Sequence, residues 1–190
     1  YGIGKGVESV KIWKLDFELD KYDNLTLVNK LSIEEVQSFD GSSKKVYWVN
    51  PEVVRLEPEK KLPLSDAPGL YAHLPVFNDK AITVLNKYLE KTAEILPLKN
   101  SEDNFYAINI LKVLDCIDYD KSEFKLFKDG KRIMRFKKYS FLEDKIQDCH
   151  IFKIKDEPLG SPFVTDDFRD VVKSNELTGF IFKQVWDSEE

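Results

Sequence analysis

Three aspartates, Asp115, Asp118 and Asp120, lie close together directly after an apolar run at residues 105–114. Carboxylates gathered at the end of a strand can bind a hard cation or share acid–base work. Their spacing does not match a calcium loop, which needs a glycine at its sixth position and a glutamate at its twelfth. We interpret this group, the Asp115 patch, first as a polar turn that ends a strand. An acidic contact surface for a basic partner ranks next, above a metal or acid–base site.

A cysteine nucleophile activated by a histidine would be a second kind of chemistry. Cys116 and His150 could meet in space, but neither lies in a local motif that supports the pairing. Cys149 precedes His150, and adjacent residues on a strand point to opposite faces, so the two would chelate a metal poorly. We expect both cysteines to be buried thiols rather than a disulfide. An enzyme that uses Cys116 with His150, or the carboxylates near Asp115, is an alternative function.

The segment from Lys125 to Lys138 carries seven basic side chains against one acid, Asp129, with aromatic residues between them. Such a pattern occurs in surfaces that bind single-stranded nucleic acid. Asp129-Gly130 also separates two β-prone runs and predicts a hairpin, because glycine accepts the positive φ of a type I′ turn. Since the rest of the chain is acidic, we prefer a hairpin with core aromatics and solvated or paired lysines. A nucleic-acid-binding module remains the alternative.

The two faces of this hairpin are both predicted to be apolar. One face carries Phe124, Leu126 and Ile133, and the other carries Phe127, Met134 and Phe136. Apolar residues on both faces indicate a hairpin inside a layered fold.

Apolar and polar residues alternate near the N-terminus, where Trp13, Leu15, Phe17 and Leu19 are interleaved with Lys14, Asp16, Glu18 and Asp20. A period of two predicts a half-buried strand with a mostly acidic outer face. Its acids, Asp16, Glu18 and Asp20, form a second candidate contact surface, the Asp16 patch.

Three further elements are expected to position these groups. Asn78 or Asp79 can cap a helix whose apolar residues recur at helical spacing until Pro97 stops any continuation. The apolar run up to Leu114 fits a central strand covered on both sides. Thr165 can cap a short helix that begins with two aspartates.

The totals indicate one globular α+β domain over residues 1–190, with a mainly antiparallel sheet and a few packed helices. Breakers at 63–69 divide a variable, β-rich part (1–69), with extended chain at 45–56, from a core (70–190). A net charge of −5 argues against nucleic acid or an anionic membrane as partner, and no apolar run is long enough to span a membrane. The segment Gly2–Gly6 lacks the context of a phosphate loop, so we expect no cofactor and no metal.

Short segments over residues 75–186 follow one another in a distinctive order. They are 75–78, 96–98, 105–118, 121–124, 150–154, 163–166 and 177–180. In this order they resemble a family of bacterial polymorphic-toxin immunity proteins, which the N-terminal 70 residues match only loosely.

The resemblance implies a cytoplasmic protein that protects its cell by binding a toxin, and it implies no catalytic residues. We therefore expect an immunity protein that occludes a cognate protein toxin without catalysis. The acidic balance of the chain would suit a basic toxin.

Overall fold

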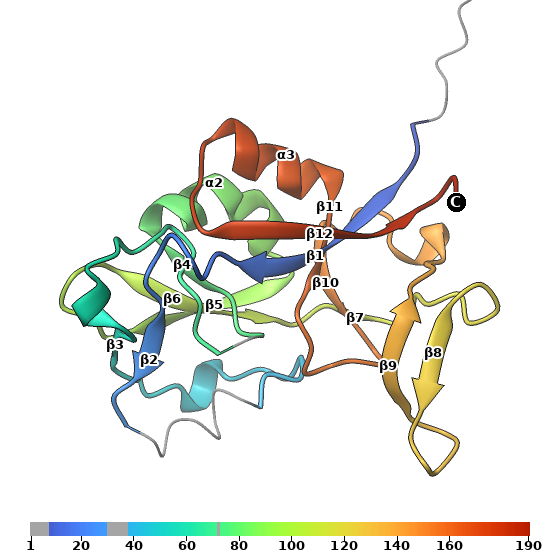
Figure 1. The fold of residues 1–190 in the computed structure, drawn as a ribbon, viewed down its shortest axis with the longest axis horizontal. Coiled ribbons are helices and arrows are strands. Elements are labelled where there is room, and N and C mark those ends of the chain that lie inside the picture. The colour runs from blue at the N-terminus through green and yellow to red at the C-terminus, as the bar shows by residue number, and fades with distance from the viewer. Residues whose placement is uncertain (1–7, 30–37, 72) are drawn as a thin grey trace, which may run out of the picture.

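The computed structural model describes residues 8–29, 38–71 and 73–190 (Figure 1). The segment Gly2–Gly6 lies outside the described residues. The fold is α+β and its sheets are mainly antiparallel, as expected.

The largest sheet has five strands in the order β12-β1-β11-β10-β7. These are β12 (Phe180–Asp187), β1 (Lys11–Phe17), β11 (Phe163–Thr165), β10 (Ile151–Ile154) and β7 (Val113–Leu114). All neighbouring pairs are antiparallel except β10 with β7. The first and last strands that the structure describes, β1 and β12, are thus neighbours in this sheet.

A second sheet places β6 (Phe105–Ile110) between β4 (Val76–Asn78) and β5 (Ala93–Leu98). The predicted central strand is therefore confirmed as far as Ile110. The apolar run then divides, because the exposed residues Leu111 and Lys112 carry the chain from this sheet into β7 of the other. Pro97 lies within β5, an edge strand, where a missing N–H is tolerated.

Helix α2 (Asp79–Leu89) begins as predicted, since the side chain of Asn78 accepts a hydrogen bond from the backbone N–H of Ala81 at 3.0 Å. Helix α3 (Asp166–Ser174) follows β11 directly. The prediction of a capping Thr165 side chain is wrong: its hydroxyl lies 2.8 Å from Nδ1 of His150 instead, and makes no cap hydrogen bond.

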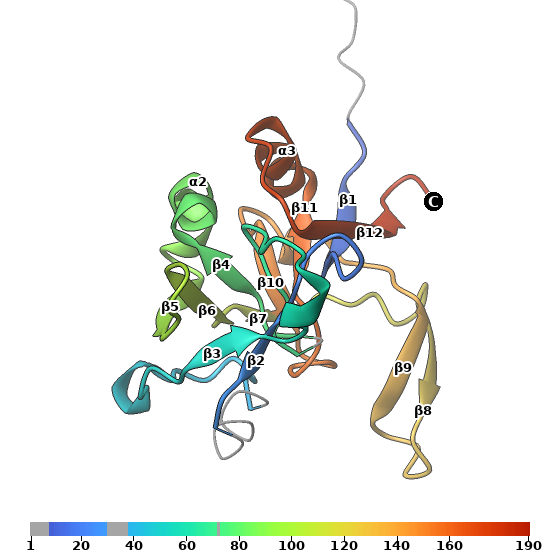
Figure 2. The same ribbon diagram turned by 60° about the vertical axis from the view of Figure 1, so that its left-hand side comes forward.

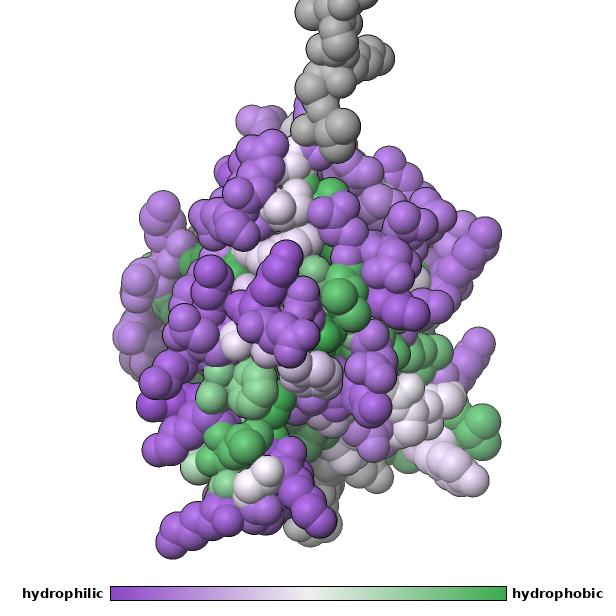
Figure 3. Space-filling model, turned by 90° about the vertical axis from the view of Figure 1, so that its right-hand side faces the viewer, coloured by the Kyte–Doolittle hydropathy of each residue, from purple (hydrophilic) through white to green (hydrophobic). Residues whose placement is uncertain are grey.

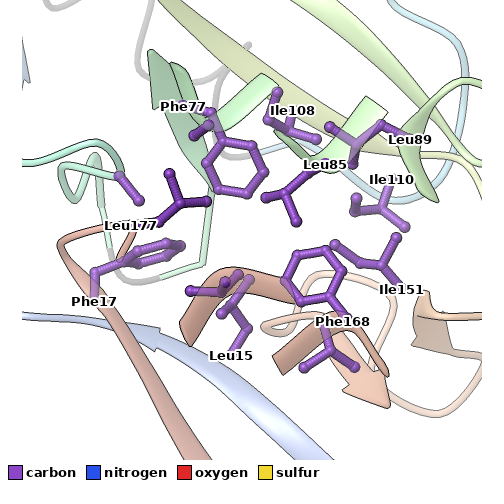
Figure 4. Close-up of a cluster of buried hydrophobic side chains, with 14 residues drawn as sticks. Leu15, Phe17, Phe77, Leu85, Leu89, Ile108, Ile110, Ile151, Phe168 and Leu177 are labelled. Atoms are coloured by element: carbon purple, nitrogen blue, oxygen red, sulfur yellow. The ribbon is translucent and has the colours of Figure 1, made fainter. Parts of the chain in front are cut away.

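The main core is contributed by the two larger sheets and by helices α2 and α3 (Figure 4). It includes Leu15, Phe17, Phe77, Leu85, Leu89, Ile108, Ile110, Ile151, Phe168 and Leu177. The opposite face of the five-stranded sheet is covered by a second cluster around Phe141, Phe152, Phe163 and Trp186. Since both faces are buried, β10 is buried at every position and shows no alternation.

The N-terminal part contributes a small sheet of β2 (Leu25–Leu27) and β3 (Val53–Arg55), with 3-10 turns η1 (Lys45–Tyr47) and η2 (Pro58–Lys60). The expectation of extended chain over 45–56 is therefore only partly right. A third core cluster joins this sheet to β4, β5 and β6. The single domain and its division near 63–69 remain predictions.

The predicted hairpin is present as β8 (Glu123–Leu126) and β9 (Ile133–Lys138), with Gly130 at φ 67° in its loop; a 3-10 turn η3 (Glu143–Lys145) follows. Its predicted faces are wrong in part, because register shifts place Phe136 opposite Phe124. Figures 1 and 2 show the hairpin projecting from the body, so it does not lie inside the layers.

Candidate partner-binding surfaces

The Asp16 patch lies where β1 leaves the five-stranded sheet. The strand ends at Phe17, earlier than predicted, so Glu18 and Asp20 belong to the following turn and Leu19 is 62% exposed instead of buried. The departure is fixed by the N–H of Glu18, which donates to the carbonyl of Gly179 at 2.9 Å. Asp16 remains on the strand with its side chain exposed.

The carboxylates of this patch accept hydrogen bonds from neighbouring backbone groups. Asp16 accepts a hydrogen bond from the N–H of Phe17 and Glu18 accepts one from the N–H of Asp20. Within the part of the chain that the structure describes, no lysine or arginine forms an ion pair with any of the three acids. Their negative charge is therefore available to a partner.

A pocket of about 480 Å³ lies beside this charge. Asp16 lines it together with partly exposed apolar side chains, which are Leu19 at 62%, Leu56 at 50% and Tyr71 at 36%. An apolar pocket bordered by a carboxylate fits a long basic side chain, whose aliphatic stem packs on the walls while its charged end reaches the acid. The sequence had indicated the acids, but Leu56 and Tyr71 reach the site only through the tertiary fold.

The Asp115 patch is more occupied by its own neighbours. Asp115 pairs with Lys155 at 3.2 Å, and Asp118 accepts hydrogen bonds from the N–H groups of Asp120 and Lys121. Asp118 thus stabilises the polar turn that we ranked first. Asp120 is exposed, and its carboxylate forms no ion pair with any residue that the structure describes.

Tyr119, inside the same turn, has a hydroxyl 3.0 Å from both carboxylate oxygens of Asp156. Burial of the phenol and this acceptor raise the pKa of Tyr119 to about 12. Across all described residues, no three histidine, cysteine or acidic side chains form a group that could hold a metal ion.

A model of the immunity protein family Imm11 matches residues 92–187, half of the chain. The chain belongs to the Imm11 immunity protein family. A comparison with curated proteins found no match. The matched region begins at residue 92, whereas the resemblance seen in the sequence begins near Pro75. The match confirms the resemblance to an immunity protein family. It runs from β5 through β12, so it contains the Asp115 patch and leaves the Asp16 patch outside.

Membership in the Imm11 family supports an immunity function, and the thiols of this Imm11 protein fit a structural role. Both cysteines are free and buried. Burial, followed by the charges of Asp115 and Asp156, raises the pKa of Cys116 to about 12. Because the thiolate is the reactive form, this environment disfavours a nucleophile. His150 contacts Thr165 at 2.8 Å and packs on the ring of Tyr88, and neither contact involves Cys116.

A buried lysine that the sequence did not reveal lies on β10. Lys153 is 2% exposed, and its ammonium donates to the carbonyls of Phe39 at 2.6 Å and Pro158 at 3.1 Å. Burial lowers its pKa to about 8, although the charge of Asp40 acts in the opposite direction. Its two acceptors lie in separate loops, so Lys153 joins those loops to the sheet.

None of the described helices is long and apolar enough to cross a membrane.

Proposed function

We propose that this protein binds a cognate bacterial toxin and neutralises it by occlusion, without catalysis, in the cytoplasm. The observation that carries the proposal is membership in the Imm11 immunity family, whose model spans β5 to β12. The raised pKa of the Cys116 thiol supports a non-catalytic role, because it removes the strongest candidate nucleophile at neutral pH.

The Asp16 patch is our proposed contact surface, with the Asp115 patch as the second candidate. Unpaired carboxylates attract a basic toxin and accelerate encounter, while the adjoining apolar pocket can hold an anchor side chain. In the Asp115 patch, an ion pair and a turn already use two of the three carboxylates. A basic partner surface would therefore gain less there.

The test is co-purification of the tagged chain from its native cell lysate, including the product of the adjacent open reading frame, with mass spectrometry of what binds. We expect a stoichiometric complex with the C-terminal domain of a large secreted protein, and loss of that domain's toxicity in the complex. A complex that leaves the toxicity unchanged would contradict occlusion. Recovery of a bound metal or small molecule without any protein partner would favour an enzyme.

A further inference from the structure

A groove of about 810 Å³ separates the β8–β9 hairpin from the loop that follows β10. The hairpin lines it with Phe127 and with residues 131–134, and the loop lines it with residues 155–161. Lys14 and His73 complete the lining. The groove is separate from both acidic patches, although Lys155 takes part in its wall and pairs with Asp115.

The hairpin carries a charge opposite to that of the body. Residues 125–138 have a net charge of +6 against −5 for the whole chain, so the remaining residues carry −11. Of the seven basic side chains in this range, Arg132 alone forms an ion pair with a described residue, Asp129 at 2.6 Å. The expected alternative of lysines paired with acids on neighbouring strands is therefore wrong, and the positive charge faces outward.

Apolar side chains lie among these charges. Phe127 is 41% exposed, Met134 is 43% exposed, and Leu159 across the groove is 53% exposed. Figure 3 views the molecule from the side on which the hairpin projects and shows apolar patches between hydrophilic side chains. A surface that is both basic and apolar suits a ligand that is both acidic and apolar.

The aromatic rings of the hairpin are poorly placed to stack on bases. The guanidinium of Arg132 covers the ring of Phe127 at 5.2 Å. Phe124 and Phe136 pack against each other and against tyrosines of the body. Nucleic acid binding without base contacts would rely on phosphates, which the −11 charge of the body repels.

The groove wall opposite the hairpin adds a second restriction. Asp156 and Glu157 line it beside Lys155, whose ammonium is paired with Asp115 outside the groove. Each of the two carboxylates accepts a hydrogen bond from a tyrosine hydroxyl, that of Tyr119 or that of Tyr139. A continuous phosphate backbone would bring negative charge to both walls. A peptide can place its carboxylates on the Lys131 side only.

We propose that the hairpin groove binds an acidic, amphipathic segment of a partner polypeptide. Its carboxylates face Lys131, which forms no ion pair with a described residue, and its apolar side chains contact Met134 and Leu159. This goes beyond toxin neutralisation through the Asp16 patch, because the surface, the charge and the partner segment are all different. Failure of either proposal leaves the other standing.

The test is fluorescence anisotropy of the whole chain with a fluorescein-labelled peptide in which glutamate alternates with leucine, at low ionic strength. Lys131→Glu alters the groove, and Lys137→Glu makes the same charge change on an exposed position of β9 outside it. We expect Lys131→Glu to weaken peptide binding roughly three- to ten-fold, and Lys137→Glu to weaken it clearly less.

Four results would overturn the proposal. They are no peptide binding at low salt, equal weakening by the two variants, tighter binding of a labelled oligouridine that Lys131→Glu weakens, and self-association of the chain that Lys131→Glu abolishes. The third result would assign the groove to nucleic acid, and the fourth would assign it to a second copy of this chain.

Discussion

The carboxylate of Asp66 joins the N-terminal part of the chain to its C-terminal turn. It accepts hydrogen bonds from Nδ2 of Asn78 at 2.9 Å and from the N–H and hydroxyl of Thr178 at 2.8 and 3.0 Å. The contact brings Ser65 so close to Gly179 that a side chain at position 179 would collide with the side chain of Ser65. Gly179 has φ 89°, a backbone conformation that glycine adopts without steric cost.

Gly179→Ala should therefore destabilise the protein strongly. An alanine here would have to adopt a positive φ, which is strained for any residue with a side chain. Its methyl group would also collide with the side chain of Ser65 and the carbonyl of Ala67. We expect the free energy of unfolding to fall by roughly 3 kcal/mol, measured by urea denaturation. Gly130→Ala is the control, since φ is also positive but no atom lies within 4 Å, and it should cost only about 1 kcal/mol. Equal losses in the two variants would show that the contact with Ser65 is unimportant.

Lys153 holds β10 to the loops at Phe39 and Pro158 through a buried ammonium. Its folded-state pKa of about 8 lies below the ordinary 10.5, so the unfolded chain binds this proton more tightly. The low pKa therefore lowers the free energy of unfolding. This contribution has its full size below pH 8 and disappears as the pH rises from 8 towards 10.5. Apolar burial of the lysine stem contributes at every pH.

Lys153→Met keeps the stem and removes the titrating group. Between pH 7 and pH 9 we expect the free energy of unfolding of the original chain to rise by about 1 kcal/mol relative to that of the variant. Urea denaturation of both proteins across this range measures the difference. Parallel pH profiles would mean that Lys153 titrates at its ordinary pKa in the folded protein.

Local signals predicted the elements whose environment is simple. Helix α2 has one buried face and an Asn78 cap, and the hairpin has its Asp129-Gly130 turn, so both were found from sequence. The alternation of apolar and polar residues predicts a strand that continues to Leu19, whereas the chain leaves the sheet at Phe17. The acids of the contact patches could be recognised from the sequence. Their pocket neighbours and Lys153 could not, since only long-range packing brings them there.

The charge of the protein is divided between an acidic body and a basic hairpin. The two carry −11 and +6, so a partner experiences a field that depends on its direction of approach. Within the acidic body, the Asp16 patch combines unpaired carboxylates with an apolar pocket. A basic toxin should therefore be attracted to the Asp16 patch and repelled by the basic hairpin.

Charge reversal in the Asp16 patch should slow association with the toxin domain recovered in the complex. For Asp20→Lys we expect the association rate constant at low salt to fall roughly three- to ten-fold, while the dissociation rate changes much less, because an exposed charge acts mainly on the encounter. Stopped-flow or surface-based kinetics measure both rates, and added salt should reduce the difference between variant and original chain. Glu90→Lys, at the C-terminal end of α2, makes the same charge change outside both patches and should leave association nearly unaltered. If Asp120→Lys slows association and Asp20→Lys does not, the toxin binds at the Asp115 patch, and the pocket beside Asp16 has another use.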